Sequence, residues 1–392
     1  MKALVIIPST LRGGVEEYVL RVTSGAVKAG WDVHVALPNA PDVQALINDF
    51  QQNGVDYHPL TIAETIYRKK LAWFRRYLPQ FIKTIALLKR LQPDVVQIVL
   101  PHPENCLGSI LACAFLQVPT VVRFGLVASQ WSFDSLRLKL YRWARSRHQQ
   151  WVTISQNNRE LVSRSFEMPQ QDIVCIYNGA SVVVPDRTPQ EIEATRNTVL
   201  QELGLSPNSI LALTVGRLEG QKGYTDLIPA IPHIVKEFPT VQFIWVGDGK
   251  DRPKLTNLVK EYGIEANVLF LGYRSDVPKL LEIADLFVFP THFEGGQSSA
   301  IAEAMAYGLP IVTSNASGIP EVIDHGVHGL LFRTGDSCDL LETLRWTLRH
   351  PEQMQQMAHN AQVRSHDFSE AKMVQNMLDL WHKMSDRSTE AI

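Results

Sequence analysis

Residues 210–223 read ILALTVGRLEGQKG. The stretch begins as a continuous apolar run, which is typical of a parallel strand covered on both faces, and the run ends at Gly216. Arg217 and Lys222 follow, with glycines beside them. Two cations placed after a strand and next to a helix N-terminus form a binding site for an anion, although such cations can also be solvated surface charges. The stretch therefore indicates a fold built on buried parallel strands and a ligand that carries negative charge.

The same alternation of apolar strands and helical segments runs along most of the chain. Strand-type runs lie at 3–7, 32–37, 94–100, 120–124 and 151–155, and the pattern restarts at 210–216, 241–247, 268–272, 286–290, 310–314 and 328–332. This predicts an α/β protein with two tandem Rossmann-like, doubly wound domains at 1–185 and 186–367, joined by a Pro-containing hinge near 181–190. An amphipathic helix is predicted at 368–386. Since ligands of such sheets bind beyond the carboxyl ends of the strands, we expect an interdomain cleft.

Composition is that of a soluble globular protein, with 45% hydrophobic and 20% charged residues. The net charge of -2 hides an asymmetry between the two halves of the chain. Residues 1–190 carry 21 basic and 14 acidic residues, a net charge of +7, whereas residues 191–392 carry 17 basic and 26 acidic residues, a net charge of -9. The four cysteines form no C-x-x-C pair, and no apolar run reaches the roughly 20 residues of a membrane span. We therefore expect a cytoplasmic protein whose first half meets something anionic.

Two acidic residues stand out in PTHFEGGQSSAIAEAMAYGLPIV, residues 290–312. Glu303 interrupts a helical stretch that otherwise reads as core, and Glu294 lies in the loop before it. A carboxylate there needs hydrogen-bond donors, and the vicinal hydroxyls of a ribose suit it well. The alternative is that Glu303 pairs with a basic residue or reaches water.

Other cofactor signatures are weak or absent. Gly13 and Gly14 lead into a helix and offer backbone N–H groups to a phosphate, although a glycine pair is more often only a turn. The VGDGKDRPKL stretch has Arg252 where a dinucleotide fingerprint has its third glycine, and the chain contains neither a P-loop motif nor D-x-D. We therefore expect no cofactor and no metal-held diphosphate.

Taken together, several stretches resemble the retaining glycosyltransferases of family four with the GT-B fold, also called glycosyl transferases group 1. The resemblance covers nearly the whole chain. It is carried by GGVEEYVLRV, YNGAS, GRLEGQKG, VGDG, FLGYRSDVPKLLEIADLFVFPT, EGGQSSAIAEAMAYGLPIVTS and SGIPEVIDHGVHGLLF. The C-terminal stretches are the more specific ones.

The resemblance implies transfer of a sugar from a nucleotide-diphosphate sugar to a glycan, lipid-linked or small-molecule acceptor, with retention of configuration and without a metal. The implied catalytic residues are Arg217, Lys222 and Glu294, with Glu303 on the nucleotide ribose. The other implied donor contacts are Gly13, Gly14, Gly216, Gly295, Gly296, Gln297, Ser298, Ser299, Tyr273 and Arg274. The resemblance also implies that the C-terminal helix crosses back to the N-terminal, acceptor-side domain.

Two departures from the family pattern concern the site. Eight residues separate Glu294 from Glu303, whereas the family has seven. Phe124 and Gly125 stand where many members carry a histidine, which leaves His102 as a possible contact to the donor sugar, although a lone histidine after a strand is more often structural.

A basic, aromatic-rich segment distinguishes the N-terminal half. Between Thr65 and Pro93 there is no acidic residue, and the cations are Arg68, Lys69, Lys70, Arg75, Arg76, Lys83, Lys89 and Arg90. Residues 68–90 suit an anionic membrane surface, an acidic acceptor or simply solvent, and no nucleic-acid motif accompanies them.

The alternatives to a glycosyltransferase are a nucleotide-sugar epimerase or sugar phosphorylase on the same fold, or a catalytically silent relative that only binds nucleotide-sugar or glycan.

Overall fold

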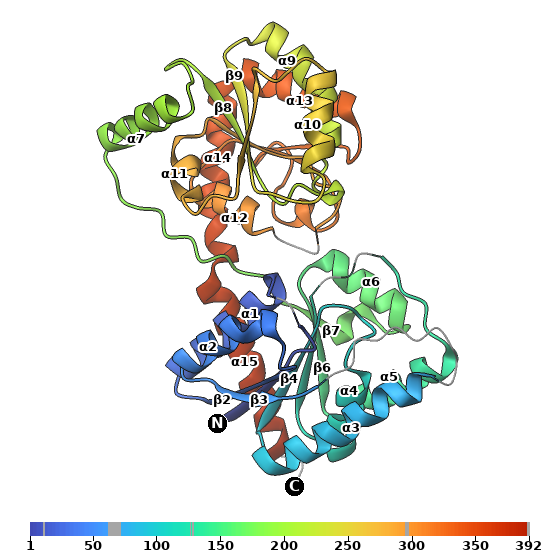
Figure 1. Ribbon diagram of the computed structural model, residues 1–392. Helices are drawn as coiled ribbons and strands as arrows, with labels where there is room; N and C mark the ends of the chain where they lie inside the picture. The colour runs from blue at the N-terminus through green and yellow to red at the C-terminus, as the bar shows by residue number, and fades with distance from the viewer. Residues whose placement is uncertain (11, 62–71, 126, 128, 295–297, 390–392) are drawn as a thin grey trace. The chain divides into compact units, whose positions relative to one another are not determined.

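The structure is a computed structural model that describes residues 1–10, 12–61, 72–125, 127, 129–294 and 298–389. The chain divides into two compact units. Unit 1 comprises Met1–Gly179 and Glu370–Ile392, and unit 2 comprises Ala180–Ser369. Each is built around one wholly parallel sheet, in agreement with the predicted fold class (Figure 1).

The sheet of unit 1 has seven strands in the order β3-β2-β1-β4-β5-β6-β7. The strands are β1 (Lys2–Ile6), β2 (Asp32–Leu37), β3 (Asp56–Pro59), β4 (Val95–Leu100), β5 (Thr120–Phe124), β6 (Gln149–Thr153) and β7 (Ile173–Cys175). The Val- and Ile-rich runs of β1, β2, β4, β5 and β6 are buried on both faces, so each of these strands contributes alternate side chains to two separate cores.

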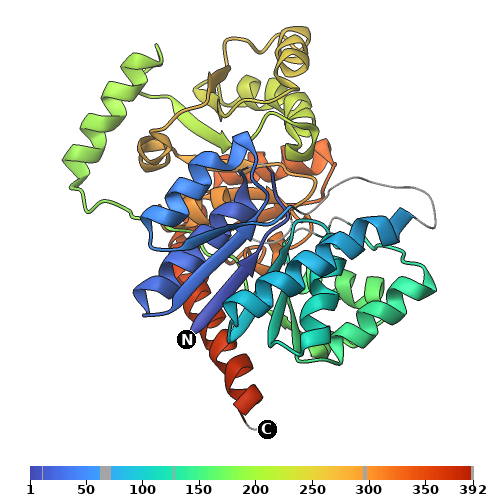
Figure 2. The ribbon, with the colours of Figure 1, turned by 60° about the horizontal axis from the view of Figure 1, so that its bottom comes forward.

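Helices cover both faces of this sheet. The first core packs the sheet against α1 (Gly14–Lys28), α2 (Gln44–Gln52) and α15 (Glu370–Thr389). The second packs it against α3 (Ala72–Leu91), α4 (Leu107–Leu116), α5 (Ser135–Arg145) and α6 (Gln156–Phe166). Figure 2 shows α3 running along the sheet on the side away from α15.

The C-terminal helix α15 is part of unit 1, as the fold prediction requires. It lies against α1 in Figure 1 and places Met377 and Trp381 in the core, where neither is exposed. The indole Nε1 of Trp381 donates to Gln97 Oε1 at 3.1 Å, which fixes the helix to strand β4.

A buried arginine in β5 contacts the end of the first stretch of unit 1, just before the chain enters unit 2. Arg123 in β5 is 1% exposed, and its guanidinium carbon lies 3.4 Å from the centroid of the Tyr18 ring. The guanidinium also donates to the side-chain oxygen of Asn178. Burial lowers the pKa of Arg123, and among the described residues no carboxylate forms an ion pair with it.

The sheet of unit 2 has six strands in the order β10-β9-β8-β11-β12-β13. They are β8 (Ile210–Val215), β9 (Val241–Val246), β10 (Val268–Gly272), β11 (Leu286–Phe289), β12 (Ile311–Ser314) and β13 (Leu330–Phe332). One face packs against α8 (Tyr224–Leu227), α9 (Ile231–Glu237), α10 (Arg252–Glu261) and α13 (Ser337–Arg349). In Figure 1, α7 (Pro189–Glu202), α11 (Val277–Ile283) and α12 (Ser299–Ala306) lie on the other side of the sheet. Helix α14 (Pro351–Ser365) packs against α12 and places Met354 in the core of the first face.

The structure adds two strands that the sequence pattern did not predict, β3 and β7. Strand β3 has the sequence DYHP, and a proline-ended polar tetrapeptide has no apolar alternation to reveal it. Strand β7 is only three residues long. The helix N-terminus predicted next to Arg217 and Lys222 lies just after them, because residues Gly220–Lys222 form a 3₁₀ turn and α8 begins after Gly223.

Candidate functional site

The loop after β8 is packed tightly against the loop after β11. Gly223 has a φ of +68°, and a Cβ atom there would lie 1.8 Å from the carbonyl oxygen of Pro290, so only glycine fits. The backbone N–H of His292 donates to the carbonyl of Gln221 at 2.7 Å, and the Gln221 side chain donates to the carbonyl of Phe293 at 2.7 Å. These contacts hold the two motif segments together, although they are far apart in the sequence.

Lys222 and Glu294 form an ion pair across these two loops. Each side chain is 12% exposed. The carboxylate of Glu294 also accepts from the Thr291 hydroxyl at 3.0 Å, and the Lys222 ammonium lies 4.8 Å from the centroid of the Phe289 ring. The pair therefore holds the ammonium in place at the end of β8, partly shielded from water.

Arg217 follows the same strand but remains 64% exposed. Its guanidinium pairs with Glu219 at 2.9 Å. An exposed pair of this kind contributes little stability, so the guanidinium is free to exchange Glu219 for an anionic ligand at small cost.

Helix α12 presents its N-terminus and one side to the same space. It begins after Ser298, and among the described residues no side chain caps its first N–H groups, which leaves them for a ligand. Glu303 is half-buried one turn along the helix, and Tyr307 follows one turn later. Burial, followed by the negative charges of Glu282 and Glu303, raises the pKa of Tyr307, so this tyrosine stays a neutral phenol.

These elements enclose a pocket of about 510 Å³ in unit 2. It is lined by most of the predicted donor residues that the structure describes in this unit: Gly216, Arg217, Lys222, Tyr273, Arg274, Ser298, Ser299 and Glu303. Glu294 does not line it and reaches it only through Lys222. The pocket thus combines three cationic side chains, a helix N-terminus and a carboxylate in a single space, a combination suited to a molecule with an anionic end and a hydroxylated middle.

Tyr273 and Arg274 occupy the rim beyond β10. Tyr273 is 86% exposed, so its ring offers a free aromatic face. Arg274 donates to Asp276 at 2.7 and 2.8 Å and to Glu202 at 2.7 Å, and these hydrogen bonds raise the pKa of Arg274. Because its guanidinium is engaged on two carboxylates, Arg274 shapes the rim rather than supplying a free charge.

The remaining predicted site residues lie elsewhere or are not described. Gly13 precedes α1, where its carbonyl accepts from the N–H of Glu17 at 3.0 Å, and Gly14 is the first residue of that helix. His102 follows β4, and its carbonyl accepts from the N–H of Asn105 at 3.0 Å. All three belong to unit 1. Gly295, Gly296 and Gln297 lie outside the described residues.

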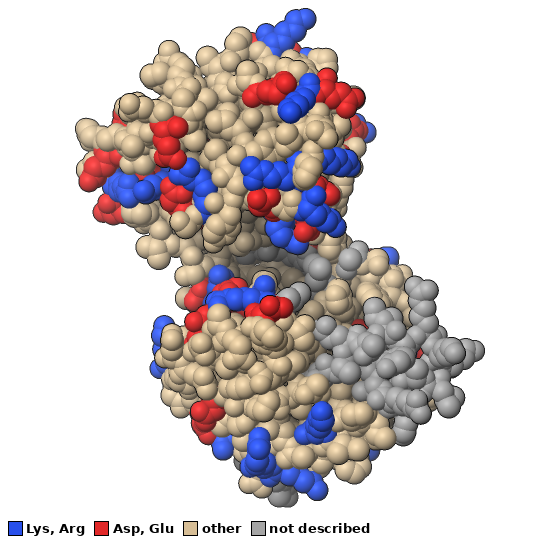
Figure 3. All heavy atoms as spheres, viewed as in Figure 1, with Lys and Arg blue, Asp and Glu red and all other residues tan. Residues whose placement is uncertain are grey.

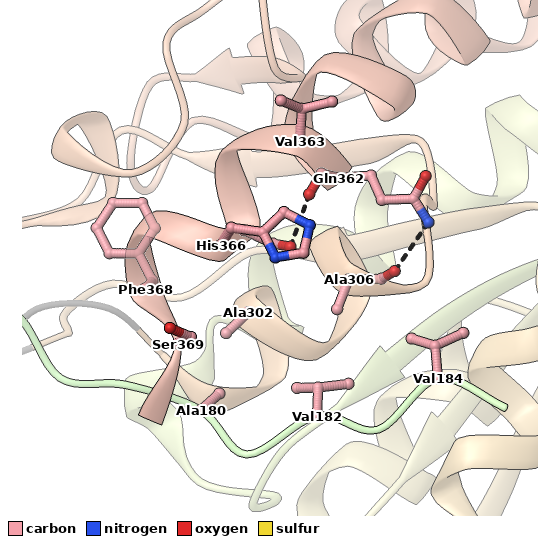
Figure 4. A pocket seen from close by; sticks show the side chains of 11 residues that line it. Ala180, Val182, Val184, Ala302, Ala306, Gln362, Val363, His366, Phe368 and Ser369 are labelled. Carbon is pink, nitrogen blue, oxygen red and sulfur yellow. Dashed lines mark hydrogen bonds between the residues drawn. The ribbon is translucent and has the colours of Figure 1, made fainter. Parts of the chain in front are cut away.

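Sequence reasoning missed part of the pocket wall. Ser181, Val182 and Val183 line it, although the sequence suggested only a hinge there. A second pocket of about 380 Å³ lies on another side of α12, lined from that helix by Ala302 and Ala306 (Figure 4). Figure 4 shows Val182 and Val184 pointing toward it from the extended segment, so Val182 borders both pockets, whereas Ser181 and Val183 line only the first.

The described part of the chain contains one group of side chains close enough to hold a metal ion, and that group lies in unit 1, outside this pocket. No helix within the described ranges has both the length and the apolar character needed to cross a bilayer.

Comparison with known protein families gives two matches that together span most of the chain. The family described as "Glycosyl transferases group 1" matches residues 195–364, and "Glycosyltransferase Family 4" matches residues 12–182. The first match contains Arg217, Lys222, Glu294 and Glu303, and the second contains Gly13, Gly14 and His102.

Individual proteins show more distant similarity. Spore coat protein SA of Bacillus subtilis is 28% identical over 60% of this chain, which spans 65% of that protein. A Campylobacter jejuni protein, N,N'-diacetylbacillosaminyl-diphospho-undecaprenol alpha-1,3-N-acetylgalactosaminyltransferase, is 26% identical over 78% of this chain and 81% of its own length. The crystal structure of Anabaena HepE in complex with UDP superposes with a TM-score of 0.78 at 21% identity, over 98% of this chain and all of that one.

Proposed function

Because the chain belongs to the group 1 glycosyl transferases, we propose that it transfers a sugar from a nucleotide-sugar donor to an acceptor. The observation that carries the proposal is the pocket of about 510 Å³ in unit 2, which gathers Arg217, Lys222, Glu303 and the start of α12. That the related HepE crystal contains UDP supports a nucleoside diphosphate as the bound part of the donor.

The proposed binding mode follows from the charges around the pocket. The diphosphate lies between Arg217, Lys222 and the first N–H groups of α12, and the ribose hydroxyls donate to Glu303. Glu294 holds the Lys222 ammonium in position. The base lies toward Tyr273, whose exposed ring offers it a stacking face.

The proposed chemistry is departure of the nucleoside diphosphate from the anomeric carbon of the sugar. Negative charge then grows on the leaving phosphate oxygen, where Arg217, Lys222 and the helix N–H groups stabilise it. We further propose retention of configuration by attack from the side of the leaving group, with that phosphate oxygen accepting the acceptor's proton. No step requires a metal ion, because the cations of the protein and the helix N-terminus neutralise the diphosphate.

A lipid-linked glycan is the proposed acceptor. The Campylobacter relative is named for a diphospho-undecaprenol acceptor. Unit 1 exposes apolar side chains on α3 and α4, namely Leu78, Ile82 and Phe115, and α3 also exposes Lys83, a combination that suits the surface of an anionic membrane. The cations of α5 contribute less, because Arg137 and Arg145 are paired with carboxylates at 2.8 and 2.5 Å.

In Figure 3 many of the blue atoms of unit 2 lie next to red ones, whereas the blue atoms at the lower end of unit 1 stand among uncharged residues. Liposome sedimentation tests the membrane proposal. We expect binding to anionic vesicles at low salt that weakens at high salt and is reduced by Ile82→Glu. The matched control is Val363→Glu, an exposed apolar residue of unit 2. Equal binding of both variants would contradict the proposal.

The donor proposal is tested by thermal unfolding with a panel of nucleoside diphosphates and their sugars, since a ligand of the folded state raises the Tm with the logarithm of its concentration. We expect one nucleoside diphosphate to stabilise the protein, and its sugar conjugate to be consumed when an acceptor is added. An epimerised donor without transfer would indicate an epimerase, and binding without turnover would indicate a silent relative. If no nucleotide raises the Tm, the proposed site is wrong.

A further inference from the structure

Helix α12 presents a polar stripe to the donor pocket, the space of about 510 Å³ in unit 2. Ser299, Glu303 and Tyr307 follow one another at intervals of four residues, and all three line this pocket. Residues four apart on a helix lie on one face, about 6 Å from each other along the axis. Their neighbours Ala302 and Ala306 face the second pocket instead (Figure 4). Tyr307 therefore faces the donor pocket from the C-terminal end of the stripe.

The hydroxyl of Tyr307 is available to a ligand. The side chain is half-buried, and within the described ranges no protein group forms a hydrogen bond with its hydroxyl. Arg187 and Glu282 act on it through their charges, but they are paired with each other at 3.1 Å. Long side chains on a helix lean toward its N-terminus, which directs the phenol of Tyr307 toward the turn that carries Glu303.

The surroundings keep this hydroxyl protonated. Burial, followed by the negative charges of Glu282 and Glu303, raises the pKa of Tyr307, and the opposing effect of Arg187 is the smallest of the four. A neutral phenol carries an O–H donor, whereas an ionised carboxylate only accepts hydrogen bonds. The stripe thus places a hydrogen-bond donor one helical turn beyond an acceptor.

The order of groups in a nucleotide matches the order of side chains along the stripe. With the diphosphate at the start of α12, carbon C3′ of the ribose lies nearer to that end of the helix than carbon C2′ does. The 3′-hydroxyl then meets Glu303, and the 2′-hydroxyl lies between Glu303 and Tyr307. Because the carboxylate takes the hydrogen of the 2′-hydroxyl, the lone pairs of that oxygen need a separate donor, and the phenol of Tyr307 can supply it.

We propose that Tyr307 is a specificity-determining residue that donates its O–H to the 2′-hydroxyl oxygen of the donor nucleotide, while Glu303 accepts the hydrogen of that hydroxyl. The site thereby selects ribonucleotides over 2′-deoxyribonucleotides, because a ligand without this hydroxyl leaves polar groups of the site unpaired. The inference rests on the proposed function, since it requires a nucleotide in the donor pocket. It does not depend on which sugar is transferred or on the acceptor.

The test is a cycle that pairs one hydroxyl of the protein with one hydroxyl of the ligand. The full chain is titrated calorimetrically with UDP, GDP and ADP, and then with the 2′-deoxy and 3′-deoxy forms of a nucleotide that binds. The parent protein should bind the 2′-deoxy form at least about tenfold more weakly than the ribonucleotide. Tyr307→Phe should weaken binding of the ribonucleotide roughly three- to tenfold and leave binding of the 2′-deoxy form unchanged. It should weaken binding of the 3′-deoxy form as much as that of the ribonucleotide, because the 2′-hydroxyl is still present.

The matched control is Tyr262→Phe, which removes the hydroxyl of an exposed tyrosine that belongs to unit 2 but does not line the donor pocket. This variant should bind all three forms like the parent protein. If Tyr307→Phe weakens the ribonucleotide and its 2′-deoxy form equally, or changes neither, the inference is overturned while the donor site stands. A loss confined to ligands that carry the 3′-hydroxyl would assign Tyr307 to that group and would also overturn it. If the parent protein binds none of the three nucleotides, the proposed function itself is wrong, and the inference is wrong with it.

Discussion

Lys222 and Glu294 are 72 residues apart in the sequence, yet they form a direct ion pair. Each of the two side chains is only 12% exposed. The pair ties the loop after β8 to the loop after β11. An ammonium held this way needs little reorganisation when a phosphate arrives, because it is already positioned and partly shielded from water.

Replacement of Lys222 by alanine should abolish this preorganisation. We expect Lys222→Ala to reduce transfer by at least about 100-fold, since it removes a cation from the developing phosphate charge. Initial rates at saturating donor test this. Lys260→Ala removes an equal charge from the exposed side of α10 and should leave the rate unchanged. Near-normal turnover by Lys222→Ala would remove the residue from the site.

Glu303 should discriminate ligands that carry a ribose. A hydrogen bond to a charged group contributes about 1.5–3 kcal/mol, so Glu303→Gln should weaken binding of nucleoside diphosphate by roughly 10–100-fold. Binding of inorganic pyrophosphate, which lacks the sugar, should change little. Calorimetric titration of both ligands provides the comparison, and equal losses for the two would show that Glu303 does not contact the ribose.

The close contact between Gly223 and the loop after β11 can be tested by comparison with Gly204, a glycine with the same backbone φ. Gly204 has the same φ of +68°, but a Cβ there meets nothing within 4 Å, whereas at Gly223 it would meet Pro290. Gly204→Ala should therefore show only the backbone cost of about 1 kcal/mol. Gly223→Ala should lower the Tm further and weaken nucleotide binding, because Lys222 is displaced. Similar Tm values for the two variants would contradict the packing described here.

Arg123 is the fourth residue to test. Arg123→Ala leaves a cavity and an unpartnered Asn178 oxygen, and we expect it to destabilise unit 1 by about 3–5 kcal/mol. Arg123→Met fills the space without burying a charge and should be clearly more stable than Arg123→Ala. Differential scanning calorimetry compares the two. Equal Tm values would show that volume is not what matters at this position.

The sequence was sufficient to predict most of the sheet structure. Continuous Val and Ile runs such as DVHVAL identified β2, whose observed bounds are Asp32–Leu37, because a strand buried on both faces must be apolar throughout. Strand β3 was missed because its side chains, among them Asp56 and His58, are polar and its pairing depends on its neighbour β2.

The pocket-lining residues could be predicted from the sequence where a charged side chain directly follows a strand or interrupts an apolar helix. Arg217 and Lys222 follow β8, and Glu303 interrupts an apolar helix, so each can be found locally. The contribution of Val183 to the pocket could not be found, because an exposed extended segment carries no periodic signal. The Lys222–Glu294 pair arises only when β8 and β11 become neighbours in the sheet.

The interrupted sequence of unit 1 affects how the protein is made. Unit 2 is one continuous segment, so it can complete its core as soon as Ser369 has left the ribosome. Unit 1 is translated first but lacks α15, which supplies Met377 and Trp381 to its interior. Until that helix is synthesised, the apolar faces of α1 and of the central strands stay exposed to water and to chaperones, and any stop codon upstream of residue 370 would leave them so permanently.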